Sequence, residues 1–135
     1  MAERVAAIGW DGVTAELDEQ GCATMAGLLD PEECRGLVEL YAREEGFRSR
    51  VVMAAHGFGR GEYKYFAYPL PELVAELRAA LYPRLVATAN RWSEALGREV
   101  RYPDDHASFL ARCHAAGQVR PTPLLLQYGE GDYNC

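Results

Sequence analysis

The chain has 135 residues and a formal net charge of −6, with 49% hydrophobic and 25% charged residues. This size and balance predict one globular domain, residues 1–135, with a single core. No apolar run approaches the roughly 18 residues needed to span a bilayer, and the amino terminus lacks the apolar stretch of a signal peptide. We therefore expect a cytoplasmic protein without a membrane partner. The negative charge disfavours non-specific nucleic-acid binding, because that affinity comes from Lys and Arg.

Four cysteines are present, and they are expected to be reduced thiols because no C-x-x-C spacing or export signal accompanies them. Three of them stand in apolar patterns, where cysteine behaves as a small hydrophobic residue. In chain order the four are Cys22, Cys34, Cys113 and Cys135.

The first predicted element is a short helix over Trp10–Gln20, with Asp11 able to cap it and Gly21 placed to end it. The following CATMAGLL segment lacks helical spacing and predicts a short strand.

A better-marked helix starts at Asp30-Pro31, where Asp30 can accept at the cap and Pro31 loses no hydrogen bond at the first position. Gly46 is expected to end this helix. Apolar residues at helical spacing predict one buried stripe. Its members are Cys34, Leu37, Val38 and Tyr41.

The segments FRSRVVM and EYKYFAY predict two strands around the glycine-rich loop HGFGRG, because aromatic and β-branched residues favour sheets. Apolar residues then recur at helical spacing over 71–96, and Pro83 is expected to kink or split this helix.

Near the carboxyl end, Asp104 or Asp105 can cap a helix that ends at Gly117. The apolar run Leu124–Tyr128 then predicts a strand buried on both faces, followed by a turn over 129–132. The pattern after this turn predicts the start of a return strand at Tyr133-Asn134-Cys135.

Such an apolar strand needs partners, so we expect the chain to be a fragment or to be completed by another chain, with self-association through this strand as one outcome. The alternative is a complete small α+β domain in which the last strand pairs with EYKYF.

The candidate metal ligands include three histidines, His56, His106 and His114. His106 and His114 lie near one face of a predicted helix, with Cys113 beside them. No H-x-D or H-E-x-x-H motif and no second ligand cluster occurs, so surface or helix-end histidines are the favoured interpretation. The hypothesis of a Cys113–His114 nucleophile pair has even less support than a metal site, because adjacency in sequence does not bring the two side chains into contact.

The HGFGRG loop could cradle an anion through exposed backbone amides, with Arg60 and Lys64 adding charge. It matches no phosphate-loop spacing, and a mobile hairpin loop is favoured. For Asp104 and Asp105, helix capping is favoured over catalysis.

The segment PLLLQYGEGDYNC resembles the strand and turn that lead to the iron site of prolyl-4-hydroxylase-like, iron(II)- and 2-oxoglutarate-dependent dioxygenases. Two further stretches, EYKYFAYPLPELVAELRAALYPRLVATANRW and FLARCHAAGQVRPTPLLLQY, are similar to the helical amino-terminal region of a bacterial branch of this superfamily. The members of that branch are predicted oxygenases for oxidative demethylation of damaged DNA. CATMAGLLDPEEC is similar to the start of prolyl-hydroxylase-type domains.

The resemblance implies an α+β fold in which helices pack on a partial sheet, as the amino-terminal portion of a double-stranded β-helix (jelly roll). Residues 21–117 would be the mainly helical support region, and 121–135 the first core strand and turn. The parent oxygenase would bind Fe(II) through His, Asp and a distal His, together with 2-oxoglutarate. Of its site residues only Tyr128 maps onto this chain, as a 2-oxoglutarate contact, while a tyrosine packed at a strand end is the other interpretation.

Because the His-x-Asp and distal His ligands are absent, the resemblance implies that this chain alone binds neither iron nor cosubstrate and is inactive. The substrate stays open among small molecules, proteins and damaged nucleic acids.

Two other functions compete with the oxygenase interpretation. One is a binding or interaction module with an aromatic surface. The other is a nucleic-acid-binding accessory domain, which the negative charge disfavours. The aromatic residues concerned are Tyr63, Tyr65, Phe66 and Tyr68.

Overall fold

A computed structural model describes residues 1–135, and its helices and strands divide between two compact units. The first unit comprises 1–30 and 72–119, and the second comprises 31–71 and 120–135. Each unit is therefore built from two separate stretches of sequence. The prediction of one domain over 1–135 stays a prediction.

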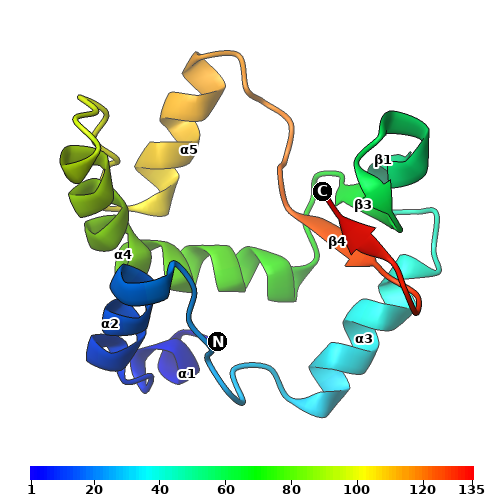
Figure 1. Ribbon diagram of the computed structural model, residues 1–135, viewed down its shortest axis with the longest axis horizontal. Coiled ribbons are helices and arrows are strands. Elements are labelled where there is room, and N and C mark those ends of the chain that lie inside the picture. The colour runs from blue at the N-terminus through cyan, green and yellow to red at the C-terminus, as the bar shows by residue number, and fades with distance from the viewer. The chain divides into compact units, whose positions relative to one another are not determined.

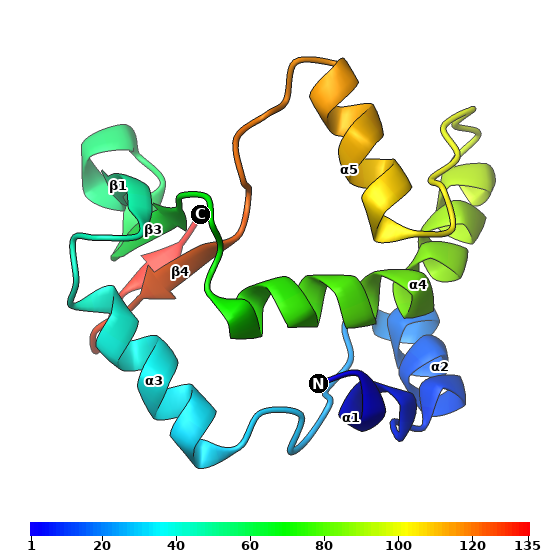
Figure 2. The ribbon, with the colours of Figure 1, turned by 180° about the vertical axis from the view of Figure 1, so that it is seen from behind.

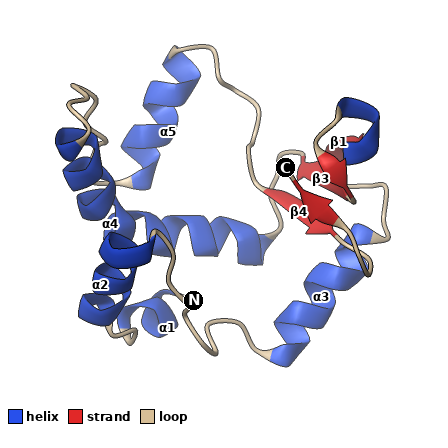
Figure 3. Ribbon diagram, in the orientation of Figure 1, coloured by secondary structure: helices blue, strands red, loops and turns tan.

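The first unit is helical (Figures 1 and 3). Its elements are α1 (Ala2–Ala6), α2 (Trp10–Gln20), α4 (Glu72–Ala95) and α5 (His106–Ala115). Helix α1 packs on α4, where the Met1 amino group lies 3.8 Å from the Glu76 carboxylate. The Trp10 indole donates to the Val5 carbonyl at 2.8 Å, which ties the start of α2 to α1.

Three predicted helices are confirmed in this unit. Helix α2 has the predicted bounds and ends at Gly21 in the left-handed region, at φ +74°. Its first residue is Trp10, so Asp11 lies inside the first turn and Gly9 occupies the capping position; the predicted Asp11 cap is wrong. Helix α4 runs through Pro83 without ending, and Figures 1 and 2 show it changing direction partway along, as a proline inside a helix predicts.

Helix α5 begins after Asp105, which accepts from the Ser108 amide at 2.8 Å and is therefore the capping carboxylate. The Ser108 hydroxyl, which also donates to Asp105, and then this amide bond lower the pKa of Asp105 below its ordinary value. The predicted CATMAGLL strand is wrong: residues 22–29 form no strand, and a turn closes where the Leu28 amide donates to the Met25 carbonyl, with Gly27 at φ +73°.

The second unit carries all the strands. Its elements are α3 (Pro31–Tyr41), β1 (Phe47–Val52), the 3-10 helix η1 (Met53–His56), β2 (Gly59–Arg60), β3 (Glu62–Phe66), β4 (Leu124–Gln127) and β5 (Tyr133–Asn134). Strands β1, β3 and β4 form an antiparallel sheet with β3 in the centre, while β2 and β5 form a separate antiparallel pair. The strands predicted around HGFGRG are confirmed. Neither sheet is closed, so the jelly roll stays a prediction.

Alternation along β3 places Lys64 and Phe66 in the buried layer beneath α3, with Glu62 half-buried on the same side. Phe66 is 2% exposed and stacks on Phe47, with their ring centroids 4.9 Å apart. The core of this unit therefore lies on the α3 side of the central strand.

Helix α3 starts at Pro31 as predicted but ends at Tyr41, short of Gly46. Its predicted buried stripe is wrong in part: Tyr41 is buried, Leu37 is half-buried, Cys34 is exposed and Val38 is 73% exposed. Cys22 is also exposed, so two of the three cysteines that stand in apolar sequence patterns lie at the surface.

The apolar run Leu124–Tyr128 forms a strand over Leu124–Gln127, and this strand pairs with EYKYF. It is not buried on both faces, because β4 is an edge strand and Leu126 is 48% exposed. Tyr133-Asn134 form a short strand, as their pattern suggested, but it pairs with β2 within the glycine-rich loop. No helix of the chain is long and apolar enough to cross a membrane.

Candidate functional site

Tyr128 follows β4 directly and lies on the wall of a shallow cavity of about 360 Å³ in the second unit. Its side chain is 45% exposed, so the ring is accessible from the cavity. The other lining residues are Gly61, Glu62, Gln127, Gly129 and Asp132. The predicted site residue therefore lies in a polar hollow formed by the start of β3, the end of β4 and the turn that follows.

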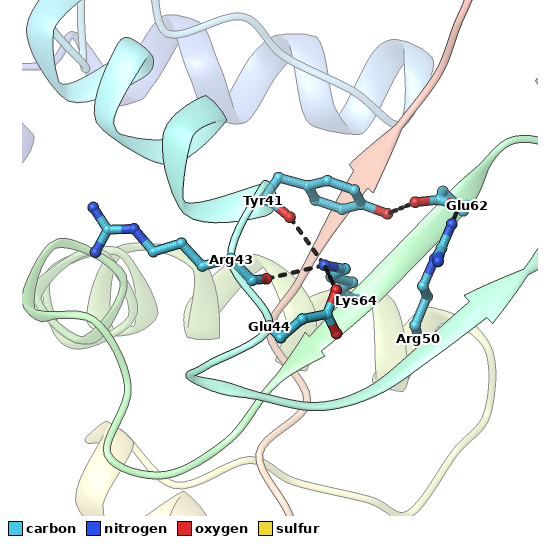
Figure 4. A network of polar contacts seen from close by, with 6 residues as sticks. All are labelled: Tyr41, Arg43, Glu44, Arg50, Glu62 and Lys64. Carbon is cyan, nitrogen blue, oxygen red and sulfur yellow. Dashed lines mark hydrogen bonds and ion pairs between the residues drawn. The ribbon is translucent and has the colours of Figure 1, made fainter.

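Glu62 is held in place by two neighbouring elements (Figure 4). Its carboxylate accepts from the Tyr41 hydroxyl of α3 at 2.8 Å and from Arg50 Nε of β1 at 3.0 Å, and Arg50 Nη2 makes a further close contact. Hydrogen bonding to Arg50 holds the pKa of Glu62 below its ordinary value. Burial, with the Glu62 bond second, raises the pKa of Tyr41. At neutral pH Glu62 is therefore a paired carboxylate on the cavity wall, and the Tyr41 phenol that donates to it from outside the cavity is neutral.

Lys64 does not serve the glycine-rich loop, contrary to the anion-cradle hypothesis. It is 5% exposed, and its Nζ donates at 3.0 Å to the carbonyls of Tyr41 and Arg43 at the end of α3 (Figure 4). Glu44 lies 3.4 Å from the same nitrogen. The last carbonyls of a helix lack partners within it, and a cation satisfies them well. Lys64 thus fixes α3 to the sheet.

The HGFGRG loop instead supports the turn that follows Tyr128. Its Arg60 Nε lies 3.6 Å from Asp132 Oδ1, and Asp132 Oδ2 accepts from the Gly129 amide at 2.8 Å. The Cys135 amide donates to the Phe58 carbonyl at 2.9 Å. Both carboxylates of the cavity, Glu62 and Asp132, are therefore paired with arginines.

No group of three His, Cys, Asp or Glu side chains in the chain is placed to hold a metal ion. His106 packs beside Tyr82, with ring centroids 5.5 Å apart, and burial, followed by the charge of Arg78, lowers its pKa. Cys113 is half-buried and His114 is exposed on the same helix. His56 stacks on Phe58 in the second unit. The histidines do not assemble into a site.

The aromatic residues of EYKYFAY do not form one surface. Phe66 is buried, while Tyr63 and Tyr65 lie on the opposite face of β3 and contact each other edge to face, with ring centroids 5.5 Å apart. Arg48 lies over the Tyr65 ring at 4.3 Å, and Tyr68 is 45% exposed.

Two other hollows occur. A larger one of about 490 Å³ in the helical unit lies among α1, α2 and residues 24–28, where Arg4 donates to the Leu28 carbonyl and Glu16 accepts from the Thr24 amide. A small apolar groove of about 140 Å³ runs between α3 and β4. Its lining residues are Leu37, Val38, Tyr41, Leu125, Leu126 and Gln127.

Sequence reasoning found Tyr128 but missed Gly61, Glu62 and Asp132. The alternating glycines at 57, 59 and 61 were the available signal, since a glycine next to a strand often marks a close backbone approach. What approaches could not be read from sequence, because the turn and the loop are far apart along the chain.

Comparison with known proteins gives a family for residues 61–135, which include every residue that lines the cavity beside Tyr128. The matching family model is Oxygenase-NA, described as "Oxygenase, catalysing oxidative methylation of damaged DNA". Two uncharacterised proteins from two strains of Mycobacterium tuberculosis are 48% identical over 69 residues, which are 51% of this chain. The match spans only 30% of the length of either relative. No solved structure matches the chain.

Proposed function

The chain belongs to the Oxygenase-NA family, and from that premise we propose that it is part of an iron(II)- and 2-oxoglutarate-dependent dioxygenase that hydroxylates or demethylates its substrate. In this proposal residues 1–135 supply a scaffold and one wall of the cosubstrate pocket. The observation that carries it is the placement of Tyr128 on an accessible polar cavity within the matched residues.

The chain's own residues do not fit an iron ion. Non-haem iron of this class needs two histidines and a carboxylate on one centre, and no cluster of that kind is present. We therefore assign no iron-dependent step to these residues. We assign the iron ligands to a longer polypeptide, in keeping with relatives of which the matched segment is 30%.

The cavity can accept an anionic cosubstrate even though two acidic residues line it. Glu62 and Asp132 are paired with Arg50 and Arg60, which offsets their negative charge. A phenol such as that of Tyr128 can donate a hydrogen bond to a carboxylate, and bonds to charged acceptors are the stronger ones. Tyr128 would thus orient 2-oxoglutarate and take no part in moving electrons.

The open edge of β4 supports a larger sheet. This strand carries no charged residue, its outer edge is unpaired, and the apolar groove runs beside it. Natural sheets usually protect an edge strand by charge, proline or cover. We propose that another strand of the longer oxygenase domain covers this edge, which would extend the sheet toward the jelly roll.

The first experiment tests the cosubstrate contact in the full-length protein, supplied with Fe(II), 2-oxoglutarate, oxygen and N-methylated DNA. We expect succinate to form, and Tyr128→Phe to raise the KM for 2-oxoglutarate by roughly tenfold with a smaller change in kcat, from the loss of one bond to a charged group. Tyr133→Phe is the matched control, because Tyr133 is 55% exposed in the same hairpin but does not line the cavity. Absence of 2-oxoglutarate turnover would overturn the proposal.

The second experiment titrates the 135-residue chain with Fe(II) and 2-oxoglutarate under anaerobic conditions. We expect no stoichiometric binding, since these residues hold no three-ligand cluster. A tight one-to-one metal site would contradict the proposed division of the active site.

The groove also favours a second candidate, an interaction module that keeps this surface free for a partner. Under the dioxygenase proposal the isolated chain self-associates through β4, and the full-length protein does not. Leu126→Lys should then suppress association, while Val100→Lys, at a 41% exposed position in the other unit, should not. If the groove stays accessible in the full-length protein, the interaction module is the better account.

A further inference from the structure

The ring of Tyr128 lies directly against the backbone of Gly61. A Cβ atom at position 61 would stand 2.8 Å from Tyr128 Cδ1 and 3.0 Å from the Gln127 carbonyl oxygen. Real Cβ atoms essentially never approach another heavy atom as closely as 2.8 Å, so only glycine leaves room for the ring in this position. Gly61 also has φ +117°, a conformation that side-chain-bearing residues rarely adopt.

The other side of Tyr128 is fixed by the turn that follows it. Asp132 folds back over this turn, with Oδ2 accepting from the Gly129 amide at 2.8 Å. Its second oxygen faces Arg60 Nε at 3.6 Å, on the residue just before Gly61. One carboxylate therefore connects the residue after Tyr128 to the loop on which the Tyr128 ring rests.

The β2–β5 pair continues this connection. Gly59 pairs with Asn134 and Arg60 with Tyr133, and a Cβ atom at Gly59 would collide with the Tyr133 carbonyl oxygen. Two glycines spaced two residues apart thus permit two close approaches. Gly59 lies against the Tyr133 backbone, and Gly61 lies against the Tyr128 ring. This explains the glycine pattern of the loop without an anion.

We propose that Gly61 and Asp132 are positioning residues that fix the orientation of the Tyr128 ring on the cavity wall. A tyrosine that is 45% exposed has freedom to rotate, and a binding group works best when its neighbours lock its rotamer. Gly61 supplies a flat surface and Asp132 closes the turn. The consequence for 2-oxoglutarate binding rests on the proposed function, whereas the orientation of the ring does not.

The test places 3-fluorotyrosine at position 128 of the full-length protein and follows it by 19F NMR. Asp132→Ala is expected to shift or broaden the resonance, because the Gly129 amide loses its acceptor. Asp132→Asn should restore it in large part, since an amide oxygen can still accept that bond. Glu130→Ala, an exposed carboxylate of the same turn, is the matched control and should leave the resonance unchanged.

Arg60→Gln gives an independent measurement should Asp132→Ala fail to fold. It removes the charge facing Asp132 but keeps the Gly129 bond, so a smaller shift than that of Asp132→Ala is expected. A resonance that is unchanged in both Arg60→Gln and a folded Asp132→Ala, or that Asp132→Asn fails to restore, overturns the proposal.

The KM for 2-oxoglutarate, measured on the same variants, separates this inference from the proposed function. We expect Asp132→Ala to raise the KM by roughly threefold to tenfold, within the effect of removing Tyr128's own bond, with kcat less affected. If the resonance shifts and the KM stays constant, Asp132 positions Tyr128 as proposed and the cosubstrate role of Tyr128 is wrong.

Discussion

The two units bury different kinds of residue. In the helical unit the buried side chains are small, and they are Val5, Val13, Val86, Thr88 and Ser93. In the sheet unit they are large, apart from Pro121, and they are Tyr41, Met53, Lys64 and Phe66. Because a large buried side chain makes many more contacts, the sheet unit concentrates its stability in a few positions. The candidate cavity lies on this unit.

The helical unit compensates with hydrogen bonds from its helices to neighbouring segments. Asn90 bonds both to the Tyr102 carbonyl, at 3.0 Å, and to the Tyr102 amide, at 2.8 Å. The Tyr82 hydroxyl donates to the Pro103 carbonyl at 2.7 Å, and Asp18 of α2 accepts from the Trp92 indole at 2.8 Å. Stability here is spread over many modest bonds, so single substitutions should matter less than in the sheet unit.

The largest expected effect is that of Phe66→Ala. Removing this 2% exposed ring leaves a cavity against Phe47 and should lower the free energy of unfolding by about 3 to 5 kcal/mol, measured by urea denaturation. Phe58→Ala is the control, at 47% exposure in the same unit, and should cost far less. Equal losses of unfolding free energy in the two variants would show that the stability of the sheet unit is not concentrated in its buried side chains.

Next in size is Lys64→Met, which keeps the length of the side chain and removes its donors. The Tyr41 and Arg43 carbonyls would lose their partner, at a cost of about 2 to 3 kcal/mol in unfolding free energy. Arg43→Met is the matched control, because Figure 4 shows the Arg43 side chain directed away from Lys64, with only its carbonyl in contact. An unchanged free energy of unfolding in Lys64→Met would mean that the position of α3 does not depend on this lysine.

In the helical unit, Tyr82→Phe should cost only about 1 kcal/mol, since it removes one hydroxyl bond and keeps the ring stacked on Phe109. The same urea titration measures it. A loss as large as that of Lys64→Met would remove the contrast between the two units.

The smallest effect is that of Glu62→Gln, and it should depend on pH. The folded pKa of Glu62 lies below its ordinary value of 4.5, so its stabilisation is present above that value and is lost as pH falls through the folded pKa. The difference in stability between wild type and Glu62→Gln should therefore shrink in acid. Glu45→Gln, an exposed neighbour, should show no such trend, and a difference that grows in acid would reverse the assigned sign.

Local signals account for what the sequence predicted correctly. Capping by Asp105, Gly21 at the end of α2 and the apolar spacing within α4 act over a few residues, so they can be read directly. Exposure of Val38 and Leu126 could not be read in this way, because it depends on which strand forms the edge of the sheet.

The residues of the candidate site likewise divide into those that local sequence predicts and those that depend on distant segments. Tyr128 was found through its resemblance to a motif and its place at a strand end. Its neighbours Gly61 and Asp132 acquire their roles only when distant segments meet. The contact of Lys64 with the end of α3 could not be predicted either, because nothing in its own segment indicates it. Membership of an oxygenase family is established, while 2-oxoglutarate dependence stays a prediction.

The interleaving of the two units has a consequence for synthesis on the ribosome. The hairpin of β1 and β3 can form as soon as Phe66 has emerged, but its third strand waits until the whole of α4 and α5 has been translated. The nascent sheet is therefore exposed along β3 throughout that interval, and the wall carrying Tyr128 assembles only after both helices have been translated. A translational pause before Leu124 would prolong this exposure and should increase capture by chaperones.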